Sequence, residues 1–194
     1  APPTEIKNCR SLLEALKKRH DYFHENGGRL SDHGLNYFVY AEFTDAALEQ
    51  AFQDVMAGKK LSDDTVVMFK AATLHHICTW NHEKGWAQQF HAGAIRNNNS
   101  RLLKRLGADA GVDSIGDWPM AEAMSRVFDR LDRDGQLAKT IVYNLNPAYN
   151  EVYATMAGNF QDGSVAGKMQ FGSGWWFLDQ KDGMEKQMNA LSNM

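Results

Sequence analysis

Apolar residues recur three and four positions apart along residues 4–26, which is the spacing of one helix face. The pair Gly27-Gly28 that follows is a typical helix stop. Five further helices are predicted from capping residues, prolines and glycine stops. They are 44–58 capped by Thr44, 62–85 capped by Ser62, one capped by Asp117 with Pro119 in its first turn, one from Pro147 to Gly158, and one that begins at Asp179.

Four short segments between these helices have the character of strands, and they are 29–35, 86–95, 139–145 and 168–174. The β-branched run Thr140-Ile141-Val142 makes the third segment the clearest of them. Residues 96–116 are predicted to be a long loop rich in asparagine and glycine. One helix followed by alternating strands and helices predicts an α/β fold of βαβ units, with a parallel sheet and right-handed crossovers.

The chain has 194 residues, which predicts a single domain over 1–194. Its composition, 43% hydrophobic and 23% charged, excludes disorder as the main state. A net charge of −3 argues against a nucleic-acid partner. No apolar run approaches the roughly 18 residues of a membrane helix, so no membrane partner is expected either. The opening Pro2-Pro3 without an initiator methionine, and a last helix without a stop, predict a piece of a longer protein.

Two cysteines, Cys9 and Cys78, lie too far apart in sequence to suggest a metal-binding pair or a disulfide framework. The start of the chain also lacks the pattern of a secretory signal peptide. We therefore expect a cytoplasmic protein.

Ligands of parallel α/β folds bind at the carboxyl ends of the strands, and polar or aromatic residues stand at all four predicted ends. They are Asp32 and His33; His91, Arg96 and Asn97-Asn98-Asn99; Asn144, Asn146 and Glu151; and Ser173, Trp175, Trp176 and Asp179. Each residue has a plain structural alternative. His91 in its apolar strand is as easily a hydrogen-bonded core histidine. Asp32 is more easily a cap at the strand end.

Arg96 directly follows an apolar strand, a position that suits an anion clamp, although a surface arginine is the alternative. One ring of Trp175-Trp176 is expected to face a pocket and the other to pack outward. The adjacent pair His75-His76 sits mid-helix and is interpreted as structural. No nucleophile elbow, phosphate loop or cysteine near a strand-end histidine is present, so proton transfer supported by Arg and His is favoured over covalent catalysis.

Several longer strings resemble one family. They are RHDYFHENGGRLSDHGL at 19–35, HAGAIRNNN at 91–99, GVDSIGD at 111–117, NLNPAYNEV at 144–152, GNFQDG at 158–163 and GKMQFGSGWWFLDQKDGME at 167–185. Together they resemble the uronate isomerase (glucuronate isomerase) family over essentially the whole chain. The resemblance implies a bacterial enzyme of carbohydrate metabolism in the amidohydrolase superfamily, built on a TIM barrel. The chain would supply about strands four to seven, a partial barrel.

The reaction that the resemblance implies is an aldose–ketose isomerisation through an enediol, from D-glucuronate to D-fructuronate and from D-galacturonate to D-tagaturonate. Matched by position, His91, Asp32 and His33 are the candidate catalytic residues. Arg96, Asn98, Trp175 and Trp176 are the candidate substrate-binding residues. The full-length enzyme would use a divalent metal, with zinc as the first choice. His91 is one candidate ligand, the main ligands lie outside this chain, and the segment by itself need not hold the metal.

Two alternatives stay open beside this interpretation. The chain could be a non-catalytic half-barrel that binds or oligomerises, or part of a metal-dependent hydrolase of the same superfamily. The missing strands imply that the chain alone has little or no activity. We also expect a homo-oligomer, because a half-barrel leaves two strand edges uncovered.

Overall fold

The computed structural model describes residues 5–194, so Ala1 to Thr4, with the proline pair, lie outside the described residues. Contacts divide the chain into two compact units. Of the described residues, the helical unit comprises 5–30, 39–87 and 126–138, and the sheet unit comprises 31–38, 88–125 and 139–194. Within the described residues, no helix is long and apolar enough to cross a membrane.

The helical unit is built from α1 (Cys9–Glu25), α2 (Asp45–Met56), α3 (Asp63–Glu83) and the later part of α5 (Ala121–Arg133). Buried Cys9, Leu48, Phe52 and Ala72 form a core cluster where the first three helices meet. The predicted caps of α2 and α3 are confirmed. The hydroxyls of Thr44 and Ser62 each accept a hydrogen bond from the backbone three residues later, at 3.2 Å.

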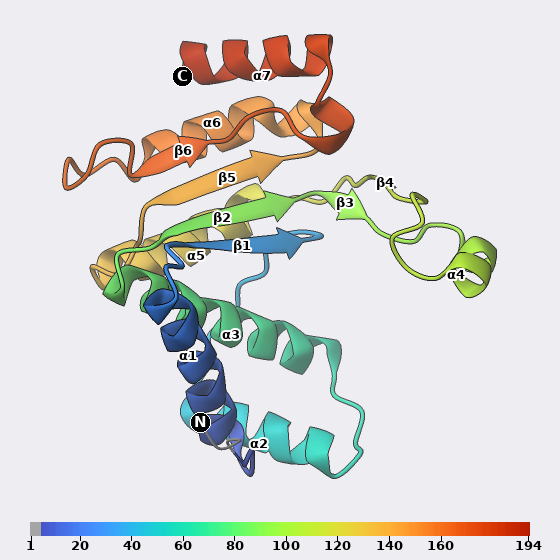
Figure 1. Cartoon of the computed structure of the whole chain (residues 1–194), viewed down its shortest axis with the longest axis vertical. Coiled ribbons are helices and arrows are strands. Elements are labelled where there is room, and N and C mark those ends of the chain that lie inside the picture. The colour runs from blue at the N-terminus through green and yellow to red at the C-terminus, as the bar shows by residue number, and fades with distance from the viewer. Residues whose placement is uncertain (1–4) are drawn as a thin grey trace. The chain divides into compact units, whose positions relative to one another are not determined.

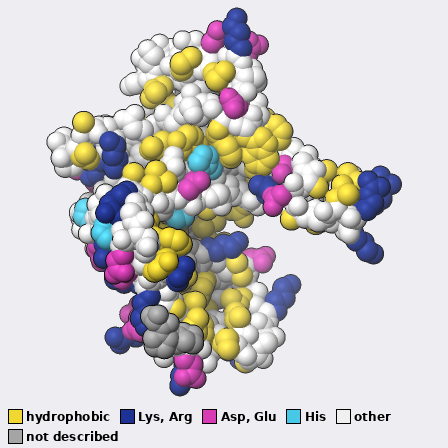
Figure 2. Space-filling model, viewed as in Figure 1, with side chains coloured by type: hydrophobic (Ala, Val, Ile, Leu, Met, Phe, Trp, Pro, Cys, Tyr) yellow, Lys and Arg dark blue, Asp and Glu magenta, His cyan; other side chains and the backbone are white. Residues whose placement is uncertain are grey.

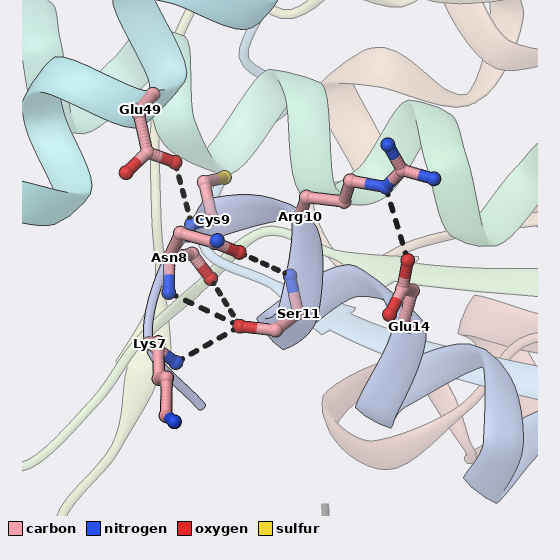
Figure 3. A network of polar contacts seen from close by, with 7 residues as sticks. All are labelled: Lys7, Asn8, Cys9, Arg10, Ser11, Glu14 and Glu49. Carbon is pink, nitrogen blue, oxygen red and sulfur yellow. Dashed lines mark hydrogen bonds and ion pairs between the residues drawn. The ribbon is translucent and has the colours of Figure 1, made fainter. Parts of the chain in front are cut away.

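The first helix starts later than residue 4, because Asn8 is its cap (Figure 3). The Asn8 side chain accepts from the Ser11 backbone at 2.8 Å, and the Ser11 hydroxyl accepts from the Asn8 backbone at 3.1 Å. Glu49 of α2 accepts from the backbone N–H of Cys9 at 2.8 Å. Free N–H groups of the first turn are thus satisfied from the same turn and from a neighbouring helix.

The sheet contains β1 (Leu30–Leu35), β2 (Ala87–Ala92), β5 (Thr140–Asn144) and β6 (Met169–Phe171), in the order β1-β2-β5-β6. β2 pairs with β5, and β5 with β6, in parallel. The arrow of β1 points the same way as that of β2 (Figure 1). All four predicted strands and their parallel pairing are confirmed. Among the described residues, β1 and β6 are the edges of an open sheet.

The two faces of this sheet differ. One face is buried and carries Gln88, Phe90, Ala92, Thr140, Val142, Asn144, Met169 and Phe171. The other face is only partly covered, and it carries Asp32, Gln89, His91, Ile141, Tyr143 and Gln170. Successive side chains of a strand point to opposite faces, so each strand contributes to both sets. A barrel keeps its interior on one of these faces and its helices on the other.

The prediction that residues 96–116 form one long loop is wrong, because this segment contains a helix and a strand. Gly93, with φ of 113°, separates β2 from β3 (Ala94–Ile95), which pairs antiparallel with β4 (Ser114–Ile115). The helix α4 (Ser100–Leu106) lies between these two strands. It begins here because the Asn99 side chain accepts a hydrogen bond from the backbone N–H of Leu102 at 3.0 Å and so caps its first turn. These elements form an arm whose tip gathers Lys and Arg side chains (Figure 2).

Two predicted helix starts are also wrong. α5 begins at Ala121, and the Asp117 carboxylate accepts instead from the Tyr149 hydroxyl at 2.6 Å. The last helix, α7 (Lys181–Asn193), is capped by Gln180 and not begun by Asp179. A 3-10 turn, η2 (Trp176–Leu178), occupies the preceding residues, and η1 (Pro147–Tyr149) similarly leads into α6 (Asn150–Gly158).

His75 of α3 should make the stability of the chain depend on pH. Burial, followed by the charge of Arg130, lowers the pKa of His75 from 6.5 to about 4. Between these values the unfolded chain binds a proton that the folded chain does not, so the free energy of unfolding falls as the pH drops through this window. His75→Phe should reduce the loss measured by urea unfolding between pH 7 and pH 5. An equal loss in both proteins would contradict this assignment.

Candidate active site

The parallel register brings Asp32 of β1 and His91 of β2 together on the partly covered face of the sheet. Their Oδ1 and Nδ1 atoms lie 2.6 Å apart, with side chains 54% and 21% exposed. A carboxylate only accepts hydrogen bonds, so Nδ1 of His91 carries the hydrogen and Nε2 is left with the lone pair in the neutral ring. The pair therefore offers an oriented imidazole that can accept or donate a proton at Nε2.

Aromatic rings flank His91 on two sides. Tyr143 of β5 stacks on it with ring centroids 4.1 Å apart and an interplanar angle of 9°. Trp175, which follows β6, meets it edge-on at 4.5 Å and 70°. The sequence analysis named Trp175 but missed Tyr143. The alternation of residues in KTIVYN could have revealed Tyr143, because it puts Tyr143 on one face of its strand. Pairing this strand in parallel with β2 then places Tyr143 beside His91.

His33 does not join this pair, because neighbouring strand residues face opposite ways. Its ring stacks on Phe90 at 5.3 Å, and its Nε2 lies 3.1 Å from the hydroxyl of Ser31. Burial lowers the pKa of His33, opposed by the negative charge of Asp32. Its surroundings thus favour a neutral ring packed on the buried side of β1.

Arg96 already has anionic partners within the sheet unit. It pairs with Asp109, and its Nε lies 3.3 Å from Oδ1 of Asp113. Its guanidinium also lies over the ring of Trp176, 5.2 Å from the centroid. The two aspartates differ sharply, since the side chain of Asp109 is 77% exposed and that of Asp113 only 5%. Arg96 is therefore oriented by one buried carboxylate and shares its charge with one exposed carboxylate.

Asn98 connects the two sides of the arm formed by β3, α4 and β4. Its amide nitrogen donates to the Ile95 carbonyl at 3.0 Å and lies 3.1 Å from the Ser114 hydroxyl. Its backbone N–H donates to the Val112 carbonyl at 2.8 Å. The donors of this predicted substrate-binding residue are thus engaged in joining the two sides of the arm.

Trp175 and Trp176 contact each other, with ring centroids 5.5 Å apart, but their other neighbours differ. Trp175 lies beside His91, whereas Trp176 is 38% exposed and stacks on Phe177 at 5.1 Å. Trp176 has a positive φ of 51°, which is strained for a non-glycine residue. Such strain commonly occurs at ligand-contacting loops, and here it aims the ring at Arg96.

The side chains of this site are of the types that bind a divalent metal, but they are too few to hold one. His91 and Asp32 supply one nitrogen and one carboxylate, both typical zinc ligands. Residues 5–194 contain no group of three or more His, Cys, Asp or Glu side chains placed to hold a metal ion. A complete coordination shell would need ligands from other parts of a longer protein.

Comparison with known proteins identifies the family. The sequence pattern described as glucuronate isomerase matches residues 2–194. The chain belongs to the glucuronate isomerase family. It is similar to the uronate isomerase of Bacteroides thetaiotaomicron, with 58% identity over 187 residues, and to that of Opitutus terrae, with 55% identity over 194 residues. These matches cover 96% and 100% of this chain, but only 40% and 41% of the two relatives.

Solved structures of the family share the fold. The chain is similar to uronate isomerase from Thermotoga maritima with a TM-score of 0.87 and 28% identity, over 96% of this chain and 40% of that one. The match to glucuronate isomerase from Caulobacter crescentus has a TM-score of 0.82 and 27% identity, over 94% and 37%. The open parallel sheet is thus part of a larger uronate isomerase fold, as the sequence predicted.

Removing Asp113 should loosen the arm more than removing Asp109. Oδ1 of Asp113 accepts the backbone N–H of Asn97 at 2.8 Å as well as contacting Arg96, and its side chain is buried. Asp113→Ala should therefore speed hydrogen exchange over residues 96–99, measured by mass spectrometry. Asp109→Ala, which removes an exposed partner of the same arginine, is the matched control. Equal exchange in the two variants would contradict the buried carboxylate as the anchor.

Proposed function

We propose that this chain carries one part of the active site of a uronate isomerase that interconverts D-glucuronate and D-fructuronate, and D-galacturonate and D-tagaturonate. The observation that carries the proposal is the His91–Asp32 hydrogen bond between β2 and β1 on the partly covered face of the sheet, in a chain of the glucuronate isomerase family. Because the chain spans about two fifths of its relatives, the complete site includes residues from elsewhere in the protein.

The reaction moves one proton between neighbouring carbons of the open-chain sugar. A base removes the proton from C2, an enediol forms, and the proton is returned at C1. His91 is suited to hold or relay a proton at Nε2, and Asp32 stabilises the imidazolium that results. A cation or hydrogen-bond donors must stabilise the enediol oxygen, and a bound divalent metal, with zinc as the first choice, would supply this Lewis acidity.

Arg96 is the proposed clamp for the carboxylate at C6 of the substrate. A planar guanidinium binds carboxylates through two parallel hydrogen bonds. Exposed Asp109 can leave Arg96 when a substrate carboxylate arrives, whereas buried Asp113 keeps the side chain oriented. Trp175 and Trp176 would then wall the sugar, with Asn98 holding the loop that presents the clamp. His33 would act only indirectly, by supporting β1 next to Asp32.

The remaining proposals concern the whole protein. Residues 1–194 would form part of one barrel domain, in a cytoplasmic homo-oligomer that binds neither nucleic acid nor membrane. The alternative of a non-catalytic half-barrel is favoured by one observation, that β1 and β6 have no further strand beside them in residues 5–194. This chain by itself would then be inactive while a complete barrel containing it turns over substrate.

A chimera tests the proposal directly. The matching segment of the Bacteroides thetaiotaomicron uronate isomerase is replaced by this chain, which is 58% identical to it, and glucuronate isomerisation is measured. The unsubstituted chimera should be active. His91→Asn and Asp32→Asn should each lower kcat by about 10²–10³-fold, the usual contribution of acid–base or electrostatic groups. His75→Ala in helix α3 is the control and should stay within about 3-fold.

Arg96→Lys in the same chimera should raise KM more than it lowers kcat. Lysine keeps the charge but loses the planar fork, so we expect KM to rise about 10-fold for glucuronate and for galacturonate alike. Asp109→Ala should lower KM or leave it unchanged, because a competing carboxylate is removed. Unchanged KM for both sugars in Arg96→Lys would mean that another residue binds the C6 carboxylate.

A further inference from the structure

Tyr143 is held in one ring position from several directions. Its ring lies parallel to that of His91, and its hydroxyl donates to Oε1 of Gln89 at 2.6 Å. A tyrosine hydroxyl can donate only one hydrogen bond, and here that bond goes to Gln89. The hydroxyl anchor and the stacked face therefore fix both the direction and the tilt of the ring.

The ring of Tyr143 occupies the space that a side chain at position 172 would fill. A Cβ built at Gly172 would lie 2.3 Å from Cε1 and 2.4 Å from Cδ1 of Tyr143, and its three nearest atoms all belong to that ring. The backbone cannot easily retreat, because the Gly172 N–H donates to the Val142 carbonyl at 2.8 Å and its own carbonyl accepts from Gln187 of α7. Any side chain at position 172 would therefore push the tyrosine ring.

The order of the strands places the ring of Tyr143 between His91 and Gly172. β5 lies between β2 and β6, so the ring of Tyr143 has His91 on one side and Gly172 on the other. A ring displaced from Gly172 moves towards His91. Gly172 also opens the GSGWW stretch, in which the sequence suggested no phosphate-binding role. The first position of that stretch must be glycine if the ring of Tyr143 is to keep its place.

We propose that Tyr143 is a positioning residue for His91 and that Gly172 is the gap in which its ring lies. The proposal rests on the function proposed above. The bond to Asp32 fixes the Nδ1 corner of the imidazole but leaves the ring able to tilt about that corner. The parallel tyrosine face removes this freedom, while Trp175 blocks one edge. Nε2 is then held in one direction, which a proton transfer at a sugar carbon requires.

A Tyr143 that only packs and a Tyr143 that positions His91 predict different effects of its removal on kcat. If Tyr143 only fills space, its loss lowers the amount of folded protein but leaves kcat per folded molecule unchanged. If it positions His91, its loss lowers kcat while KM, which depends on contacts such as that of Arg96, changes little. The effect of Gly172→Ala should further depend on whether the tyrosine ring is present.

The test is a double-mutant cycle in the active chimera, with kcat and KM measured on glucuronate. Gly172→Ala should lower kcat about 10-fold when Tyr143 is present, the scale of one aromatic pair, and by less than about 2-fold in the Tyr143→Ala background. Tyr143→Phe, which keeps the ring but loses the bond to Gln89, should lower kcat about 3-fold. KM should stay within about 2-fold in all of them.

Gly158→Ala is the matched glycine control, because a Cβ there meets nothing within 4 Å. It should leave both constants unchanged. Additive losses from Gly172→Ala and Tyr143→Ala, or a kcat for Tyr143→Ala within about 2-fold of the parent, would overturn the proposal. Should Gly172→Ala fail to fold, the two Tyr143 variants decide the matter. An inactive unsubstituted chimera would instead overturn the proposed function, and with it the positioning role.

Discussion

The alternation of side chains along a parallel strand is the constraint on which this site depends. One residue in two is committed to the buried face, where Phe90 and Val142 are fully covered. The residues between them, His91 and Tyr143, are forced onto the other face at the same register. Polar chemistry and core packing are therefore assigned to separate faces by the backbone itself. A shift of one residue in register would exchange the two sets and bury the site.

Much of the fold could be predicted because local signals agree with it. Thr44 and Ser62 cap their helices, and Gly58 and Gly85 end them with positive φ, as turn chemistry dictates. The prediction failed where a polar residue had two possible partners. Asp117 suits an N-cap by type, yet its carboxylate binds the hydroxyl of Tyr149, 32 residues later in the chain. A tertiary contact of this length leaves no local signal.

The candidate site was predicted in part for the same reason. The search at strand ends named Asp32, His91, Arg96 and Trp175, although Asp32 and His33 both lie inside β1. It could not separate Asp32 from His33, which only the pleat does. Tyr143 was missed because a tyrosine inside an apolar strand resembles core. Its role depends on the pairing of β2 with β5, and pairing is a long-range property. Asn98 was predicted from its place after a strand and from the family resemblance, whereas its donors are used within the arm.

The ion pairs of the arm fix how Arg96, the proposed clamp, is oriented in the absence of a ligand. An unpaired guanidinium near a partly covered site would lose hydration without compensation, so Arg96 is paired from the outset. Two carboxylates around one guanidinium leave an excess negative charge, which opposes a uronate. The conflict is resolved by burial, because 5%-exposed Asp113 is held by the backbone of Asn97 while 77%-exposed Asp109 is free to return to solvent. If Arg96 is the clamp proposed above, exchanging Asp109 for a substrate carboxylate would conserve the charge of the network, and specificity would come from the fixed orientation of the fork.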